Sequence, residues 1–309
     1  MIGGTGPAVP TDREIHYAAF HGISDITGAG PLVVVHGNCQ AEALRVLIAA
    51  GDVRTVRIPP VFELRQADLG RLAALLARAD VLVTQPVRDD YAGLPLGSAQ
   101  LAAALPAAAR VLRVPIVRWT GLHPVQAIIR DPQDPSAPPP GVPYHDLRTL
   151  AAAAGLPAPR PTPRTVRAVA AAAVAELRRR ESTCDVIVSD LFETPRPADM
   201  LTINHPGNRI LRALAERIRR RLGLDRATVD PGRTLLTEVI APVEDVVLQA
   251  WQLSGRGTAL PDAWRVRGEV VPDTLVREVQ LDWYRTRPDV VDAGLRRHRD
   301  TLQLLGFAA

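Results

Sequence analysis

Short apolar runs alternate with amphipathic segments along the first half of the 309-residue chain. The runs at 32–36, 80–84 and 110–117 predict strands, the first of them with the composition of a strand buried on both faces of a sheet. The stretch 53–58 alternates weakly and predicts a further strand. The segments between them repeat leucine and alanine at helical spacing, and helices are expected at 40–50, 66–79 and 98–109. This alternation predicts an α/β fold, with an open, mainly parallel sheet flanked by helices in a three-layer core.

The second half of the chain contains more predicted helix than strand. One more apolar run, at 185–189, predicts a further buried strand. Helical periodicity is expected at 144–155, 165–180, 206–222, 272–285 and 292–305, and at 239–253 with a break at Pro242. We therefore expect an N-terminal arm over 1–30 and one α/β domain over 31–309, in which 224–309 form a helical extension. The proline-rich stretch 131–143 predicts a surface loop, either a lid or a plain insertion.

The composition indicates a globular protein, with 47% hydrophobic and 23% charged residues. The longest apolar runs are shorter than the roughly 18–20 residues of a membrane span. The glycine- and proline-rich start does not have the pattern of a signal peptide, so a cytoplasmic location is the expectation. The two cysteines do not form a disulfide framework, and with scattered histidines they match no zinc spacing, so no metal site is expected.

All 37 basic residues are arginines, which excludes a catalytic lysine. The formal net charge of +4 is modest. Arginines gather at 178–180 and at 217–221, where they form either solvated helix faces or a patch for phosphate groups, which arginine binds bidentately. Nucleic acid is not an expected partner, because aromatic residues make up only 4% and no nucleic-acid motif is present.

The first apolar run leads directly into a glycine turn and a cysteine. Gly37 permits a sharp turn, and the helical pattern begins after Gln40. Cys39 is therefore expected at the carboxyl edge of the sheet, beside a helix N-terminus that favours negative charge and can lower a thiol pKa. The alternative interpretation is a small buried cysteine next to a structural turn.

Further polar residues stand at the ends of predicted strands or at a helix start. Ligands of open parallel sheets bind outside the carboxyl ends of the strands, so these residues can share one cleft. They are Cys39, Gln85, His123, Asp190 and His205. A cysteine and a histidine are the minimum for nucleophilic acyl chemistry. Asn38, Gln85 or the backbone amide of Cys39 would then hold the oxyanion, and Asp190 or Asp199 would orient the imidazole.

Each of these residues also has a structural interpretation. His205 precedes a proline and can be a helix cap, while His123 can belong to a plain turn. Gln85 can cap a strand end, and Asn204 and Asn208 can bind only the backbone around their turn. Spacing alone does not decide between the two interpretations.

Four motifs together resemble the WcbI family, named for a capsular polysaccharide biosynthesis enzyme and regarded as acyl-CoA-dependent O-acetyltransferases. They are Gly37-Asn38-Cys39-Gln40, the strand from Asp80 to Gln85, Gly121-Leu122-His123-Pro124, and Asn204-His205-Pro206-Gly207-Asn208. The resemblance spans roughly residues 30–290. It implies an enzyme that moves an acyl group from coenzyme A to a hydroxyl and holds no permanently bound cofactor.

The resemblance also suggests roles for single residues. Cys39 and His205 become the catalytic candidates. The candidates for binding acyl-CoA are Asn38, Gln40, Gln85, His123, Asn204 and Asn208, with Arg209 and Arg212 beside a helix start for the phosphates. The donor would be acyl-CoA or an acyl carrier protein with the same phosphopantetheine arm. The acceptor would be a sugar or a natural product.

Two other functions remain open at this point. The layout is also similar to the SGNH hydrolases, in which a nucleophile follows the first strand and a histidine comes late. Cysteine replaces their serine here, and no late Asp-x-x-His motif is present. A thioesterase or esterase is therefore the first alternative, and a non-catalytic module that binds coenzyme A or a nucleotide is the second.

Overall fold

The computed structural model describes residues 9–224, 227–253 and 262–307. Within it the chain forms two compact units. The first unit contains residues up to 116, together with 183–187 and 211–233, and the second contains 117–182, 188–210 and 234 onward. Helix α8, Asn208–Leu222, begins in the second unit and ends in the first.

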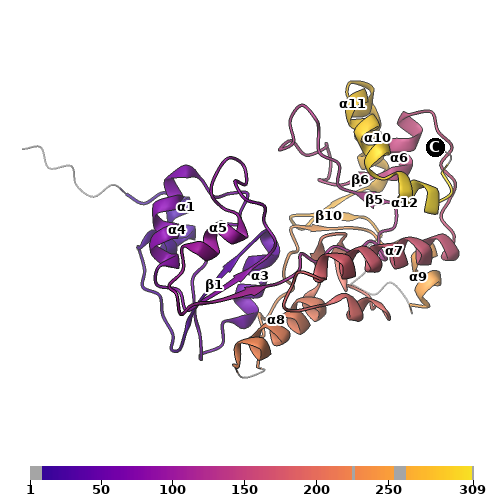
Figure 1. The fold of residues 1–309 in the computed structure, drawn as a ribbon. Helices are drawn as coiled ribbons and strands as arrows, with labels where there is room; N and C mark the ends of the chain where they lie inside the picture. Colours follow the sequence, from indigo (N-terminus) through magenta and orange to yellow (C-terminus); the bar gives the residue numbers. More distant parts are fainter. Residues whose placement is uncertain (1–8, 225–226, 254–261, 308–309) are drawn as a thin grey trace, which may run out of the picture. The chain divides into compact units, whose positions relative to one another are not determined.

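A four-stranded parallel sheet forms the centre of the first unit (Figure 1). Its strands are β1 (Leu32–His36), β2 (Arg54–Thr55), β3 (Val81–Thr84) and β4 (Arg110–Arg113). Their order is β2-β1-β3-β4, and every pairing is parallel. Every residue of β1 and β3 is buried, as expected for strands with side chains packed on both faces. The predicted parallel α/β sheet is confirmed.

Helices flank this sheet. They are α1 (Asp12–His16), α2 (Ala18–His21), α3 (Cys39–Ile48), the 3₁₀ turn η1 (Gln66–Asp68), α4 (Leu69–Leu76) and α5 (Ser98–Ala103). Leucines of α4 and α5 pack on Val34 and Leu82 of the sheet, and Tyr17 and Phe20 join the same core. The expected N-terminal arm over 1–30 therefore contains two short helices, α1 and α2. Burial of Tyr17 and Phe20 in the core holds these helices on the first unit.

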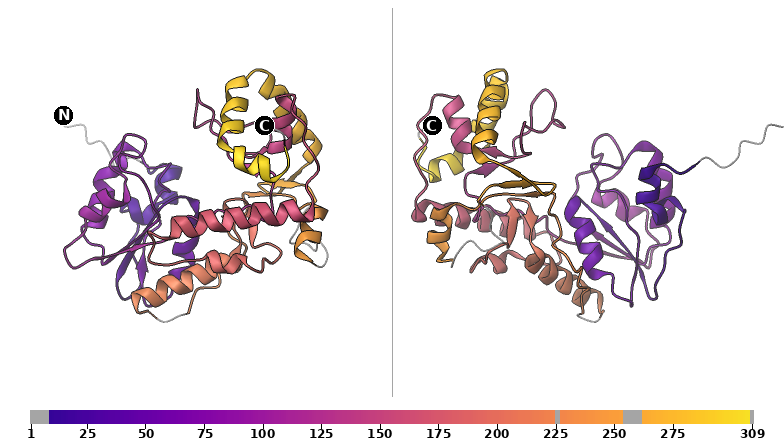
Figure 2. Two further views of the ribbon diagram at one scale, coloured as in Figure 1. Left: turned by 45° about the vertical axis from the view of Figure 1, so that its right-hand side comes forward. Right: turned by 180° about the vertical axis from the view of Figure 1, so that it is seen from behind.

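Helices and several short strand pairs make up the second unit. The helices are α6 (Leu147–Ala153), α7 (Pro163–Glu181), η2 (Ser189–Phe192), α9 (Asp245–Trp251), α10 (Asp273–Arg285), α11 (Pro288–Arg297) and α12 (Arg299–Leu304). Helices α10 and α11 pack against α6, and the yellow C-terminal helices gather there in both views of Figure 2. The predicted C-terminal helices are confirmed.

The strands of the second unit pair antiparallel. They are β5 (Gln126–Ala127) with β6 (His145–Asp146), β7 (Met200–Thr202) with β8 (His205–Pro206), and a sheet of β9 (Val239–Ile240), β10 (Trp264–Val266) and β11 (Glu269–Val271). A two-residue turn joins β10 and β11. Both its residues, Arg267 and Gly268, have positive φ, which matches the twist of a hairpin. The expected helix over 239–253 is wrong in its first part, which is β9.

The strand predicted at 185–189 is also wrong. The backbone N–H groups of Val188 and Ser189 donate to the buried carboxylate of Glu181, at 2.6 and 3.0 Å. These donors are therefore not available for a strand ladder, and the chain turns into η2 instead. Ile187 is exposed, so the apolar run is not buried throughout as a central strand requires.

The proline-rich stretch 131–143 forms an irregular surface loop, as predicted. Its first residue is fixed, because the buried carboxylate of Asp131 accepts from Arg287 at 2.7 Å. Near its other end Val142 is buried in a core cluster of the second unit. No helix among the described residues is long and apolar enough to cross a membrane.

Candidate active site

Cys39 is the first residue of α3, as the sequence predicts. Asn38 caps this helix, and its side-chain oxygen accepts from the backbone N–H of Gln40 at 2.9 Å. The cysteine is half-buried and is not in a disulfide, whereas Gln40 is fully buried. A partly accessible thiol at the start of a ten-residue helix is in an electrostatic environment that favours a thiolate.

Gln85 supports this turn from the end of β3. Its Oε1 accepts from the Asn38 backbone at 2.8 Å, and its Nε2 donates to Gln40 Oε1 at 3.3 Å. The side chain passes so close to Gly37 that a Cβ there would lie 2.2 Å from Gln85 Oε1. Position 37 therefore requires a glycine, because any larger residue would collide with the side chain of Gln85. Both glutamines are buried and bond within the turn that holds Cys39.

His36, at the end of β1, lies in the same polar network. Its Nδ1 is 3.1 Å from Thr84 Oγ1, and the ring is fully buried. Burial lowers the pKa of His36 to about 4, so the ring is neutral at pH 7. We interpret it as a structural residue of the sheet.

The other catalytic candidate, His205, lies in the second unit on β8. Its Nδ1 is buried and has no hydrogen-bond partner within the described residues. Burial lowers the pKa of His205, while the backbone of Val239 and the carboxylate of Glu238 act in the opposite direction. A mostly neutral imidazole at pH 7 is the form that accepts a proton.

Tyr144 connects His205 to its neighbours. Its ring meets the imidazole edge-on, with centroids 6.4 Å apart. Its hydroxyl donates to Asn204 Oδ1 at 2.8 Å and lies 2.9 Å from Thr202 Oγ1. Two predicted site residues, Asn204 and His205, are thus joined to a tyrosine that sequence reasoning missed.

Gly207, in the motif Asn204-His205-Pro206-Gly207-Asn208, also permits a close approach. A Cβ at Gly207 would lie 1.9 Å from the backbone oxygen of Ala198. The backbone N–H of Gly207 donates to Asp199 O at 2.9 Å. Since the clashing atom belongs to the backbone, a larger residue at 207 would displace the strand turn that holds His205.

His123 is fully buried, with carbonyl oxygens on both sides. Its Nδ1 is 3.2 Å from Pro242 O and its Nε2 is 3.2 Å from Met200 O. Burial lowers the pKa of His123 to about 4, against the two carbonyl oxygens, which raise it. The ring therefore ties β7 to the segment around Pro242.

The remaining predicted residues near α8 bond to other protein groups. Arg209 forms a two-fold ion pair with the buried carboxylate of Asp199, at 2.5 and 2.6 Å. Arg212 lies 3.5 Å from Asp230, and Asn208 Oδ1 accepts from the Leu235 backbone at 2.9 Å. The suggestion that Asp199 orients the imidazole stays a prediction; in the structure both of its oxygens bond to Arg209.

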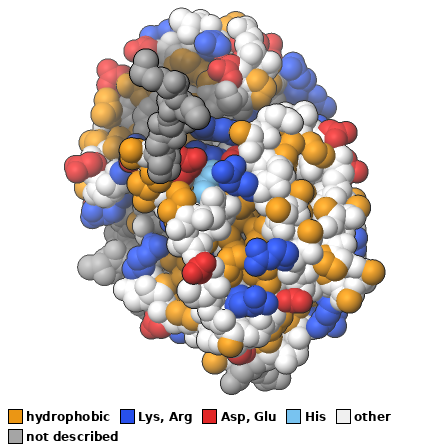
Figure 3. Space-filling model, turned by 90° about the vertical axis from the view of Figure 1, so that its left-hand side faces the viewer, with side chains coloured by type: hydrophobic (Ala, Val, Ile, Leu, Met, Phe, Trp, Pro, Cys, Tyr) orange, Lys and Arg blue, Asp and Glu red, His pale blue; other side chains and the backbone are white. Residues whose placement is uncertain are grey.

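The arginine clusters that stand out in the sequence are largely ion-paired. Arg178 and Arg179 pair with glutamates 193 and 176 at 2.9 and 2.7 Å. Arg219 is fully buried against Asp52, so the solvated interpretation is wrong for this residue, whereas Arg220 and Arg221 are exposed. On the face drawn in Figure 3, basic and acidic side chains are interspersed.

Arg118 is a cation that the sequence did not single out. It is half-buried, and its Nε has no hydrogen-bond partner within the described part of the chain. Burial lowers the pKa of Arg118. The nearby positive charges of Arg130, Arg180 and Arg297 lower this pKa further, and Tyr144 raises it. The N–H of the next residue, Trp119, donates to Ile203 O at 3.0 Å, so Arg118 lies beside the Asn204–His205 turn.

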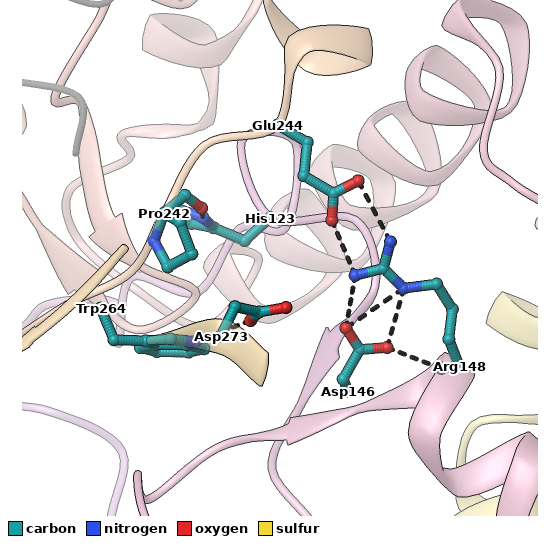
Figure 4. Close-up of polar contacts among 7 residues, drawn as sticks. All are labelled: His123, Asp146, Arg148, Pro242, Glu244, Trp264 and Asp273. Carbon is teal, nitrogen blue, oxygen red and sulfur yellow. Dashed lines mark hydrogen bonds and ion pairs between the residues drawn. The ribbon is translucent and has the colours of Figure 1, made fainter. Parts of the chain in front are cut away.

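A polar cavity of about 450 Å³ lies in the second unit. It is lined by Arg148, Arg160, Pro161, Pro242, Val243, Glu244, Asp245, Val246, Asp262 and Asp273. Figure 4 shows Arg148 between two carboxylates, Asp146 and Glu244. The N–O distances of these ion pairs are 2.6 and 2.8 Å. Burial raises the pKa of Glu244, and Asp146 and Asp273 raise it further, against Arg148.

A metal centre is not indicated by these groups. Within the described residues, no three histidine, cysteine, aspartate or glutamate side chains are placed to hold an ion. Two carboxylates beside the cavity, Asp146 and Glu244, are instead paired with the guanidinium of Arg148.

Comparison with known proteins gives a family. The profile described as polysaccharide biosynthesis enzyme WcbI matches residues 32–227. A solved structure of WcbI shares the fold, with a TM-score of 0.74 and 20% identity over 89% of this chain and 98% of that chain. It is described as the native protein without a disulfide bond between coenzyme A and one of its cysteines. No curated protein gives a significant match.

Proposed function

Since the chain belongs to the WcbI family of polysaccharide biosynthesis enzymes, we propose that it transfers an acyl group from a coenzyme A thioester to a hydroxyl of a saccharide or related acceptor. In this proposal Cys39 carries the acyl group and His205 moves the protons. The observation that supports it most is the placement of Cys39 as a half-buried thiol at the first residue of α3.

A reactive thiol suits this donor. The helix start stabilises a thiolate, and the thiolate is the nucleophilic form. An acyl group on cysteine has nearly the same energy as one on coenzyme A, so the first transfer is close to reversible. The description of the WcbI structure mentions a disulfide bond between coenzyme A and a cysteine, which that structure lacks, and this mention of the two groups together supports pairing them here.

The reaction balances in two steps. In the first, the imidazole of His205 takes the thiol proton, Cys39 sulfur bonds to the acyl carbon, and coenzyme A leaves as a thiolate that receives this proton. In the second, the acceptor hydroxyl gives its proton to His205 while its oxygen attacks the acyl carbon. The bond to Cys39 then breaks, and its thiolate recovers the proton. The products are free coenzyme A and an ester.

Arg118 is our candidate for contacting the phosphates of the donor. The two arginines that the sequence suggested for this role are paired with Asp199 and Asp230. Arg118 instead has like charges around it and an unpartnered Nε within the described residues. A phosphate would relieve this repulsion and accept charge-assisted hydrogen bonds.

We expect Arg118→Gln to weaken coenzyme A binding by about tenfold, since one charge-assisted hydrogen bond contributes about 1.5–3 kcal/mol. Titration calorimetry with coenzyme A gives the dissociation constant of each variant. The matched control is Arg164→Gln, an exposed arginine at the start of α7. Equal dissociation constants for both variants and the unaltered protein would remove Arg118 from the donor site.

Release of free thiol from acetyl-CoA tests the proposed reaction itself. A transferase is expected to release coenzyme A at least about tenfold faster when a suitable saccharide or alcohol is present, because the hydroxyl completes the second step. The panel includes neutral hexosides, amino sugars and cyclitols. Release at the full rate without any acceptor would instead identify a thioesterase.

A further inference from the structure

The polar cavity of the second unit extends beyond the lining described above. A second cavity of about 270 Å³ adjoins it and shares Arg148, Arg160 and Asp273 as lining residues. The second part also reaches Tyr144, Trp264 and Gln280. The larger of the two volumes lies within the range typical of small-molecule sites. None of these residues takes part in the reaction steps proposed for Cys39 and His205.

The charges around Arg148 leave an excess of hydrogen-bond acceptors. Arg148 donates to both Asp146 oxygens and to Glu244, so one guanidinium serves two carboxylates. A third carboxylate, Asp273, points toward this group in Figure 4. Its Oδ1 accepts from the indole N–H of Trp264 at 3.1 Å. Ionised carboxylates only accept hydrogen bonds, so a fitting ligand must present several donors.

Gln280 points to the same ligand chemistry by a separate observation. Its Nε2 donates to the carbonyl of Tyr144 at 2.8 Å and to that of Pro140 at 3.4 Å. The residue is 1% exposed, yet its Oε1 accepts no hydrogen bond within the described part of the chain. A buried acceptor without a donor costs about 1–3 kcal/mol, which a ligand hydroxyl would recover.

Tyr144 links this cavity to the candidate base. It lines the second part of the cavity, and its ring contacts the imidazole of His205. His123 Nδ1 is 3.2 Å from the carbonyl oxygen of Pro242, which lines the first part of the cavity. The cavity is therefore built into the same unit and the same network as His205.

We propose that this double cavity binds the acceptor as a hydroxyl-rich ring, a saccharide or cyclitol, with Glu244, Asp273 and Gln280 accepting from its hydroxyl groups. Arg148 holds two of the carboxylates in place and contributes donors to the ring oxygens. The assignment rests on the proposed function, because it names the acceptor of that reaction. A neutral sugar and an amino sugar share this donor-rich chemistry, and the test separates them.

The experiment measures ring binding without acyl-CoA. Methyl hexosides, myo-inositol and glucosamine are titrated into the full chain, and binding is followed by ligand-observed nuclear magnetic resonance. Asp273→Asn keeps an oxygen for the Trp264 indole, and Glu244→Gln keeps an oxygen for Arg148, so both preserve the local bonds. The matched control is Glu278→Gln, an exposed residue on α10.

At least one ring compound is expected to bind, with its affinity reduced about tenfold or more by Asp273→Asn and by Glu244→Gln and unchanged by Glu278→Gln. An equal loss of affinity for neutral and amino rings indicates that the cavity recognises hydroxyl groups. A loss of affinity for glucosamine alone indicates that it recognises the ammonium group. Either result places the ring in this cavity. Absence of binding by every compound, or binding that none of the variants alters, would overturn the assignment. Coenzyme A affinity, measured in parallel, is expected to stay the same in all three variants. A failure of acyl transfer with normal ring binding would count against the proposed reaction and not against this cavity.

Discussion

Replacing His205 with glutamine is expected to lower the turnover number for acyl transfer by about 10²–10⁴-fold, the usual contribution of a general base. Glutamine has similar size and polarity but does not take a proton. Steady-state kinetics with acetyl-CoA and the best acceptor of the panel measure the loss. Coenzyme A affinity should be retained, because the proposed role of His205 is in proton transfer.

The control for this variant is His16→Gln, since His16 is an exposed histidine on α1. The pH profile adds an independent readout. Because burial lowers the pKa of His205, activity should stay high down to about pH 6.5 and fall only as the pH drops through this lowered value. Unchanged turnover in His205→Gln would remove the histidine from the mechanism.

Acid is expected to destabilise the protein steeply between pH 6.5 and pH 4. Burial lowers the pKa of three histidines, at 36, 123 and 145, to about 4. In this window the unfolded chain binds protons that the folded protein does not, so the free energy of unfolding falls as the pH falls. Each histidine contributes about 1.4 kcal/mol per pH unit, or roughly 4 kcal/mol per unit for all three.

Urea unfolding at a series of pH values measures this slope. Above pH 6.5 the three contributions are fully present, and below pH 4 they are lost. His36→Gln should reduce the slope by roughly one third even where it also lowers the overall stability, because one of three equal contributions is removed. A free energy of unfolding that is flat from pH 6.5 to pH 4 would contradict the neutral, buried state of these rings.

The sheet and the Cys39 turn could be predicted because their signals are local. The runs at β1 and β3 are continuous and apolar, and the helix spacing after Gln40 is regular. Gly37 and Asn38 have the chemistry of a turn and a helix cap, and the structure uses Asn38 as the cap. Local propensity and tertiary structure agree at this point.

Other features depend on tertiary contacts that leave no local signal in the sequence. The run at 185–189 reads as a strand, but the carboxylate of Glu181 takes its backbone donors. Arg209 stands at a helix start, yet its charge is neutralised by Asp199. The hairpin of β10 and β11 depends on a two-residue turn whose positive φ at Arg267 has no strong sequence signal.

The polar cavity was missed for a related reason. Its lining comes from separated segments around Arg148, Glu244 and Asp273, and none of them forms a motif alone. Only the packing of α6, α10 and the loop before α9 brings these side chains together. The sequence motifs single out His123 and Asn204 as site residues. They do not predict the groups to which these residues bond, Pro242 O and Met200 O for His123 and the Tyr144 hydroxyl for Asn204.

The most direct test of the account is the intact mass of the protein after brief mixing with acetyl-CoA in the absence of acceptor, followed by acid quenching. We predict a mass increase of one acetyl group, located on the peptide that contains Cys39 and absent from Cys39→Ala, which should also lose transfer activity. An unmodified protein, together with full turnover in Cys39→Ala, would contradict the claim that Cys39 carries the acyl group.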